Sequence, residues 1–167
     1  MKKLLLFLTL LSVACQNNNK SFSIDNIENG VIYEVNVRQY SETGHFDDFT
    51  KDIHKLKDLG VKIIWLMPIH PISQNKRKGT LGSYYSVSNY KEVNSEFGNK
   101  EDLDELIAEA HKNEMLVILD WVANHTGWDH DWIKTNPEYY TKNNDGEITD
   151  PINPDTGKSW GWTDVAD

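Results

Sequence analysis

The chain has 167 residues, of which 38% are hydrophobic and 26% are charged, a balance typical of a globular protein and not of a disordered one. Its formal net charge of −9 argues against a nucleic-acid partner, because binding to a phosphate backbone requires a basic face. Six tryptophans and seven tyrosines are many for this length. Such side chains either pack a core or, near polar loops, suit a ligand with flat apolar faces such as a sugar ring.

The first 14 residues have the pattern of a signal peptide. Two lysines precede an apolar run from Leu4 to Ala14, which is too short to cross a bilayer. Cys15 is the only cysteine, so an intrachain disulfide is excluded. We therefore expect residues 1–14 to be removed and residues 15–27, which begin with a polar stretch after the cysteine, to form a tether.

The sequence around Cys15 resembles the lipobox of bacterial lipoproteins, in which the cysteine is lipidated and becomes the first residue of the mature protein. Ser12 departs from the usual leucine, and Leu11 lies one place earlier. The resemblance implies lipidation of Cys15, a membrane partner through that anchor, and an extracytoplasmic location in a bacterial cell envelope. The alternative is an ordinary secretory signal with a chance cysteine.

From residue 31 onward, strands and helices are predicted to alternate. Strands are predicted over residues 31–40, 61–69 and 116–122 from β-branched, aromatic and continuous apolar runs. A helix that stops at Gly60 separates the first two strands, and a polar loop over residues 73–94 and a helix capped by Asn99 precede the third. The apolar faces expected on the two helices are Phe46, Phe49, Ile53, Leu56 and Leu59, and Leu103, Leu106, Ile107 and Ala110.

This alternation predicts an α/β fold in which a parallel sheet is covered by helices. Ligand sites in such folds form at the carboxyl ends of the strands, which is where Asp120, Asn124 and His125 follow the third strand. The alternative is a local role for each residue, with Asp120 capping a turn and His125 bonded to a backbone carbonyl. The other residues expected at this rim are Tyr40, His70, Tyr84 and Tyr85.

Four stretches of the chain resemble the α-amylase family of glycoside hydrolases. DWVANH, residues 120–125, is similar to the signature Asp-x-Val-x-Asn-His at the end of the third barrel strand. LGSYYSVSNYKEVNSEFGNKEDL resembles the loop before the second helix, and VIYEVNVRQYSETGHF and GVKIIWLMPIHPI resemble the first two strands. The resemblance covers residues 28–167. Asn89 departs from a frequent aspartate, and Tyr84 from a frequent glycine.

The resemblance implies roles for the residues that match its motifs. Tyr85 matches the tyrosine that stacks on the sugar at the cleavage site, and His125 matches the histidine that bonds hydroxyls of that sugar. Asp120 matches a carboxylate that holds the site geometry. Asn124 matches a ligand of structural Ca²⁺, a cation that needs several further oxygen ligands; a side chain that ties the loop to the backbone is the alternative for Asn124.

The resemblance further implies the amino-terminal part of a (β/α)8 TIM barrel, with about three strands over residues 28–125 and a loop-rich, incomplete insertion over residues 126–167. Family members retain configuration with an aspartate nucleophile and a glutamate acid/base from strands four and five. No Gly-x-Arg-x-Asp signature follows His125. The expectation is therefore an amino-terminal fragment with no catalytic carboxylate of its own, inactive alone.

Three functions remain open from the sequence. The first is hydrolysis of α-glucosidic bonds in starch or maltodextrins, with an α-glucan oligosaccharide or polysaccharide as the partner. The second is transfer or isomerisation of the same bonds. The third is a non-catalytic, glycan-binding surface lipoprotein or a gene product without function.

Overall fold

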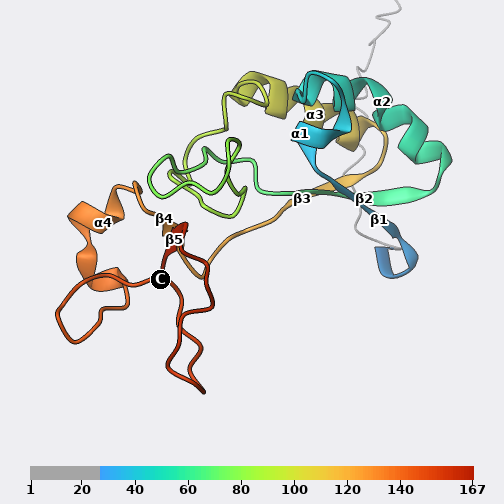
Figure 1. The fold of residues 1–167 in the computed structure, drawn as a ribbon. Helices are drawn as coiled ribbons and strands as arrows, with labels where there is room; N and C mark the ends of the chain where they lie inside the picture. Colours follow the sequence, from blue (N-terminus) through green and yellow to red (C-terminus); the bar gives the residue numbers. More distant parts are fainter. Residues whose placement is uncertain (1–26) are drawn as a thin grey trace, which may run out of the picture.

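The computed structural model describes residues 27–167, which begin with a parallel sheet and its helices (Figure 1). The sheet order is β1-β2-β3, and both neighbouring pairs are parallel, which confirms the predicted α/β class. The signal peptide, Cys15 and residues 15–26 of the tether lie outside the described residues. The elements of this part are η1 (Ile27–Asn29), β1 (Val31–Val35), α1 (Val37–Tyr40), α2 (Phe46–Asp58), β2 (Val61–Leu66), α3 (Lys100–Lys112) and β3 (Leu116–Leu119).

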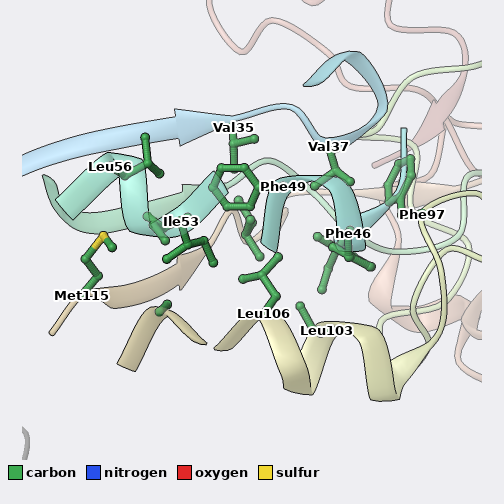
Figure 2. Packing of buried hydrophobic residues seen from close by; sticks show 14 of the residues in the cluster. Val35, Val37, Phe46, Phe49, Ile53, Leu56, Phe97, Leu103, Leu106 and Met115 are labelled. Atoms are coloured by element: carbon green, nitrogen blue, oxygen red, sulfur yellow. The ribbon is translucent and has the colours of Figure 1, made fainter. Parts of the chain in front are cut away.

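The core lies between the sheet and helices α2 and α3, which cover the same face of the sheet (Figures 1 and 2). Ile64 and Leu66 of β2 are fully buried against this layer, because β2 is the central strand. Both helices present apolar side chains at helical spacing, as predicted. The buried helical residues are Phe46, Phe49, Ile53 and Leu56 of α2 and Leu103, Leu106 and Ala110 of α3.

The ends of the two helices follow the predicted signals, with one correction. Asn99 accepts a hydrogen bond from the backbone N–H of Asp102, whose carboxylate accepts one in return, so the cap of α3 is confirmed. Gly60 adopts a φ of +79°, which ends α2. Leu59 was expected on the buried face but is 71% exposed, because the helix ends before it and turns its side chain outward.

The first strand is shorter than predicted. β1 ends at Val35, and residues 37–40 form the single helical turn α1 instead of continuing the strand. The Tyr40 hydroxyl donates to the Asp52 carboxylate at 2.8 Å, and its ring packs edge-on against Phe49 with centroids 5.0 Å apart. These contacts hold Tyr40 against α2 and not at the expected rim.

The third strand is also shorter and less buried than predicted. β3 ends at Leu119, and Ile118 and Leu119 are 42% and 45% exposed because β3 is an edge strand of the described sheet. The backbone N–H of Asp120 donates to the carbonyl of Leu66 at 2.9 Å. Asp120 is therefore held at the carboxyl end of β2 as well as of β3.

Residues 126–167 form the irregular excursion that the sequence predicts. Its two ends are joined by the antiparallel pair β4 (Thr126–Gly127) and β5 (Val165–Ala166), and it contains α4 (Trp132–Thr135) and η2 (Pro137–Tyr139). The excursion and much of the loop after β2 lie beyond the end of β3, whereas the last part of that loop returns to the helices and packs Phe97 against Phe46 of α2 (Figure 1). Among residues 27–167, no helix has the length and apolar character needed to cross a membrane.

Candidate functional site

The loop after β3 is fixed by a tyrosine from the loop after β2. The Tyr90 hydroxyl lies 2.6 Å from the carbonyl oxygen of Val122 and 2.8 Å from that of His125, so its single proton is shared between the two carbonyls. Burial raises the pKa of Tyr90 to about 12, which keeps the hydroxyl protonated at neutral pH. The backbone that carries the Asn-His pair is thereby tied to the neighbouring loop.

Three of the predicted site residues are connected by hydrogen bonds. The Tyr85 hydroxyl donates to Oδ2 of Asp120 at 3.0 Å, and Nε2 of His125 lies 3.2 Å from the Tyr85 carbonyl. Burial and the nearby Asp120 carboxylate both raise the pKa of the Tyr85 phenol, which stays a donor at neutral pH. Residues from two loops therefore form one polar cluster at the carboxyl end of the sheet.

Asn124 completes this cluster through the other ring nitrogen of His125. The two atoms Nδ2 of Asn124 and Nδ1 of His125 are 3.1 Å apart. Since an amide NH2 can only donate, Nδ1 accepts and Nε2 carries the proton that is donated to the Tyr85 carbonyl. Burial lowers the pKa of His125, which agrees with a neutral ring.

A cavity of about 560 Å³ opens beside the cluster. Tyr85 and His125 line it together with residues that sequence reasoning missed, and its volume falls within the range of small-ligand sites. Lys78 reaches in from the loop after β2 and pairs with Asp164 at 3.0 Å. The tryptophan-rich SWGW stretch was the one sequence signal for this wall. The missed lining residues are Lys78, Gly82, Ser83, Trp162, Asp164 and Val165.

A second cavity, of about 340 Å³, lies on the other side of His125. Asn124 and Trp121 contribute to its wall, and aromatic side chains of the excursion form much of the rest. His125 is thus shared between the two cavities, whereas Asn124 lines the second and not the first. The aromatic lining residues are Tyr90, Trp121, Trp132, Tyr139 and Tyr140.

Two residues expected at the rim have structural contacts instead. His70 lies with Nδ1 2.9 Å from the carbonyl of Glu92 and with its ring edge-on to Tyr90. Tyr84 lies under the guanidinium of Arg38, 4.4 Å from its ring centroid. Neither lines the cavity of Tyr85 and His125.

The amide oxygen of Asn124 is the atom that would bind the expected Ca²⁺. Its amide nitrogen is engaged by His125, and residues 27–167 contain no cluster of three or more His, Cys, Asp or Glu side chains suited to a metal ion. Ca²⁺ takes six to eight oxygen ligands. Calcium binding by Asn124 stays a prediction.

Comparison with known proteins agrees with this arrangement. A family model described as "Alpha amylase, catalytic domain" matches residues 19–159. The chain belongs to the alpha-amylase family. An alpha-glucosidase of Schizosaccharomyces pombe is 36% identical over 140 residues, which cover 73% of this chain and 23% of that protein. The alpha-amylase SusG of Bacteroides thetaiotaomicron is 40% identical over 92 residues, which cover 54% of this chain and 12% of that protein.

Solved structures of alpha-amylase family members share the fold. The crystal structure of an alpha-amylase from Lactobacillus plantarum aligns with a TM-score of 0.75 and 42% identity, over 83% of this chain and 31% of that one. A maltogenic alpha-amylase, AmyB from Thermotoga neapolitana, aligns with the same TM-score and 34% identity, over 85% and 32% of the two chains. The three parallel strands are thus the first part of a TIM barrel, as expected, and the chain spans about a quarter of the S. pombe relative.

Proposed function

We propose that the polypeptide carrying this chain is a retaining glycoside hydrolase that cleaves α-glucosidic bonds of starch or maltodextrins. The observation that carries the proposal is the hydrogen-bonded cluster of Tyr85, Asp120 and His125 beside an open cavity at the carboxyl end of a parallel sheet. Relatives named alpha-glucosidase, oligo-1,6-glucosidase and alpha-amylase support this bond class.

Each residue of the cluster has a chemical task in the proposal. The Tyr85 ring, 39% exposed, stacks on the apolar face of a glucose unit, while Asp120 fixes its hydroxyl end. The Nε2–H of His125 turns from the Tyr85 carbonyl to a sugar hydroxyl, a bond that strengthens as the ring flattens toward an oxocarbenium ion. The neutral ring can donate this bond because its proton is on Nε2.

The acid/base chemistry is proposed to come from later strands of the barrel. Retaining glycosidases need two carboxyl groups about 5–5.5 Å apart across the scissile bond. Asp120 is engaged by Tyr85 and is assigned a positioning role, not that of the nucleophile. We therefore expect residues 1–167 alone to release no sugar, and strands four to eight to supply the activity.

Reducing-sugar release from starch and maltodextrins by the native polypeptide tests the proposal. Asp120→Asn, which keeps the size of the side chain, is expected to lower release, whereas Lys91→Ala, an exposed change in the loop after β2, is a matched control. No release by the parent protein, or equal release by parent and Asp120→Asn, would contradict the assignment.

Transfer or isomerisation is the second candidate. Structures of a trehalulose synthase and an isomaltulose synthase align with TM-scores of 0.61 and 0.58 at 29% and 30% identity, so the same fold part also occurs in proteins with those names. Product analysis separates the two. Hydrolysis gives free glucose or maltooligosaccharides in proportion to bonds cleaved, whereas transfer gives new linkages without a matching rise in reducing ends.

The proposed location is the bacterial cell envelope outside the cytoplasm, with lipidation at Cys15. Cys15→Ser removes the acceptor sulfur and should move the protein from the membrane to the soluble fraction of a Gram-negative host, since multiple acyl chains anchor firmly. Ser12→Leu, which restores the usual lipobox leucine, is the control and should stay in the membrane. Equal membrane retention of Cys15→Ser and parent would contradict the lipoprotein proposal.

A further inference from the structure

Two tryptophans of the excursion form an exposed pair next to the cavity. Trp160 and Trp162 have ring centroids 6.1 Å apart and planes 24° from parallel, and they are 52% and 48% exposed. Two adjacent, half-exposed indole rings form a larger apolar surface than a single exposed side chain, and contiguous apolar surface of this kind is a common feature of ligand-binding sites. Trp160 and Trp162 lie beyond residues 19–159, so the match to the family model does not account for them.

The pair is continuous with the proposed sugar site. Trp162 lines the same cavity as Tyr85 and His125, and its ring meets that of His125 with centroids 6.1 Å apart and planes at 64°. Trp160 contacts Trp162 and is itself half exposed, so the aromatic surface continues beyond the residues that line the cavity. A linear ligand bound at Tyr85 could therefore run across Trp162 to Trp160.

The backbone under the two rings is held in place. Lys78 donates to the carbonyl of Gly161 at 2.8 Å while it pairs with Asp164, whose side chain is 9% exposed. The backbone N–H of Trp160 donates to the carbonyl of Pro151 at 3.0 Å. Gly161 adopts a φ of +78°, a conformation that is strained for a residue with a side chain. The rings are thus presented on a fixed turn, which lowers the entropic cost of binding.

We propose that Trp160 and Trp162 form an additional subsite that binds glucose units of an α-glucan chain remote from the bond being cleaved. The proposal rests on the proposed function and adds a preference for longer chains. Flat, half-exposed indole rings suit the apolar faces of successive pyranose rings, and no charged side chain is needed for this contact. The subsite contributes to binding and not to the chemical step.

The test is the chain-length dependence of kcat/KM in the native polypeptide, measured with maltotriose and maltoheptaose. Trp160→Ala should lower kcat/KM for maltoheptaose about tenfold, equivalent to about 1.4 kcal/mol, and leave that for maltotriose within about twofold. Trp160→Phe keeps a stacking face and should restore most of the loss. Lys158→Ala, an exposed change in the same loop, should leave both values unchanged.

The outcomes separate the subsite from the proposed function. If the parent cleaves both substrates and Trp160→Ala changes them equally or not at all, the subsite is refuted and the proposed function stands. If Trp160→Phe is as impaired as Trp160→Ala, stacking is not the contact and the subsite is refuted. If the parent neither cleaves maltooligosaccharides nor is retarded by amylose in native gels, both proposals fail.

Discussion

The hydroxyl of Tyr85 donates a hydrogen bond of 3.0 Å to Oδ2 of Asp120, and this bond joins the loop after β2 to the end of β3. Asp120 is itself tied to β2 through its backbone N–H. The Tyr85 hydroxyl is therefore linked through Asp120 to the carboxyl ends of two paired strands. Its exposed face remains free for a ligand.

The first prediction separates the ring of Tyr85 from its hydroxyl. Tyr85→Phe keeps the stacking face but loses the bond to a carboxylate, a bond type worth about 1.5–3 kcal/mol, so kcat/KM on maltodextrins should fall about tenfold. Tyr85→Ala loses both contacts, so kcat/KM should fall further, by about a hundredfold. Steady-state kinetics measure this. Equal losses in the two variants would show that the ring face does not contact the sugar.

The second prediction concerns the proton on His125. Asn124→Asp replaces a donor with a carboxylate that can only accept, so Nδ1 must carry a proton while Nε2 still faces the Tyr85 carbonyl. The pKa of His125 should therefore rise. NMR titration of the imidazole measures it, with Asn124→Ala as the uncharged control. An unchanged pKa in Asn124→Asp would mean that Asn124 does not set the state of the ring.

The third prediction concerns stability against acid. In the folded chain, burial lowers the pKa of His125 below its ordinary value of 6.5. Below pH 6.5 the unfolded chain therefore binds more protons than the folded chain does. The contribution of the neutral ring is fully present above pH 6.5 and is lost as pH falls through the folded-state value. His130 is shifted in the same direction, again by burial.

His125→Gln should therefore reduce the loss of unfolding free energy between about pH 7.5 and about pH 5, because glutamine does not titrate in the range where histidine does. Urea unfolding at the two pH values measures the difference. His54→Gln, on the surface of α2, is the control for replacing a histidine by glutamine elsewhere in the chain. Parallel losses in His125→Gln and parent would contradict a half-buried, neutral His125.

The fourth prediction concerns Arg38, which holds the loop before Tyr85. Its guanidinium lies 3.3 Å from the carbonyl of Leu81 and 3.0 Å from Glu96, and it stacks over Tyr84. Arg38→Lys keeps the charge but loses the planar fork, so kcat/KM should fall about tenfold while the fold persists. Kinetics and circular dichroism together measure this. Full activity in Arg38→Lys would show that the loop keeps its place without the clamp.

The sequence predicts the site well where neighbouring strands determine it. Asp120 follows a strongly apolar run, so its position at a strand end depends on local pattern alone. The contact of Tyr85 with Asp120 also requires the fold of the long loop after β2, because Tyr85 lies 19 positions beyond Leu66, the last residue of that strand. By contrast, Tyr40 has the same sequence signal but is drawn onto α2 by Asp52 and Phe49, a tertiary contact that periodicity does not encode.

The contact between Lys78 and Asp164 in the cavity wall could not be predicted from the sequence, for a different reason. Lys78 and Asp164 are 86 positions apart and meet only because β4 and β5 bring the end of the excursion back to the loop after β2. Those strands are two residues each, too short for any periodic signal. The predicted length of the first strand was wrong because Val37, which is buried and β-branched like a strand residue, begins a helical turn.

A crystal structure of the native polypeptide with maltotriose would show whether Tyr85 and His125 bind the sugar. We predict a glucose ring stacked on the Tyr85 side chain, with one of its hydroxyl groups within hydrogen-bonding distance of Nε2 of His125 and the Tyr85–Asp120 bond intact. The opposite result is maltotriose bound only elsewhere, for example in the cavity lined by Trp121 and Trp132, with Tyr85 and His125 free of sugar. That result would contradict the assignment of Tyr85 and His125 as sugar-binding residues.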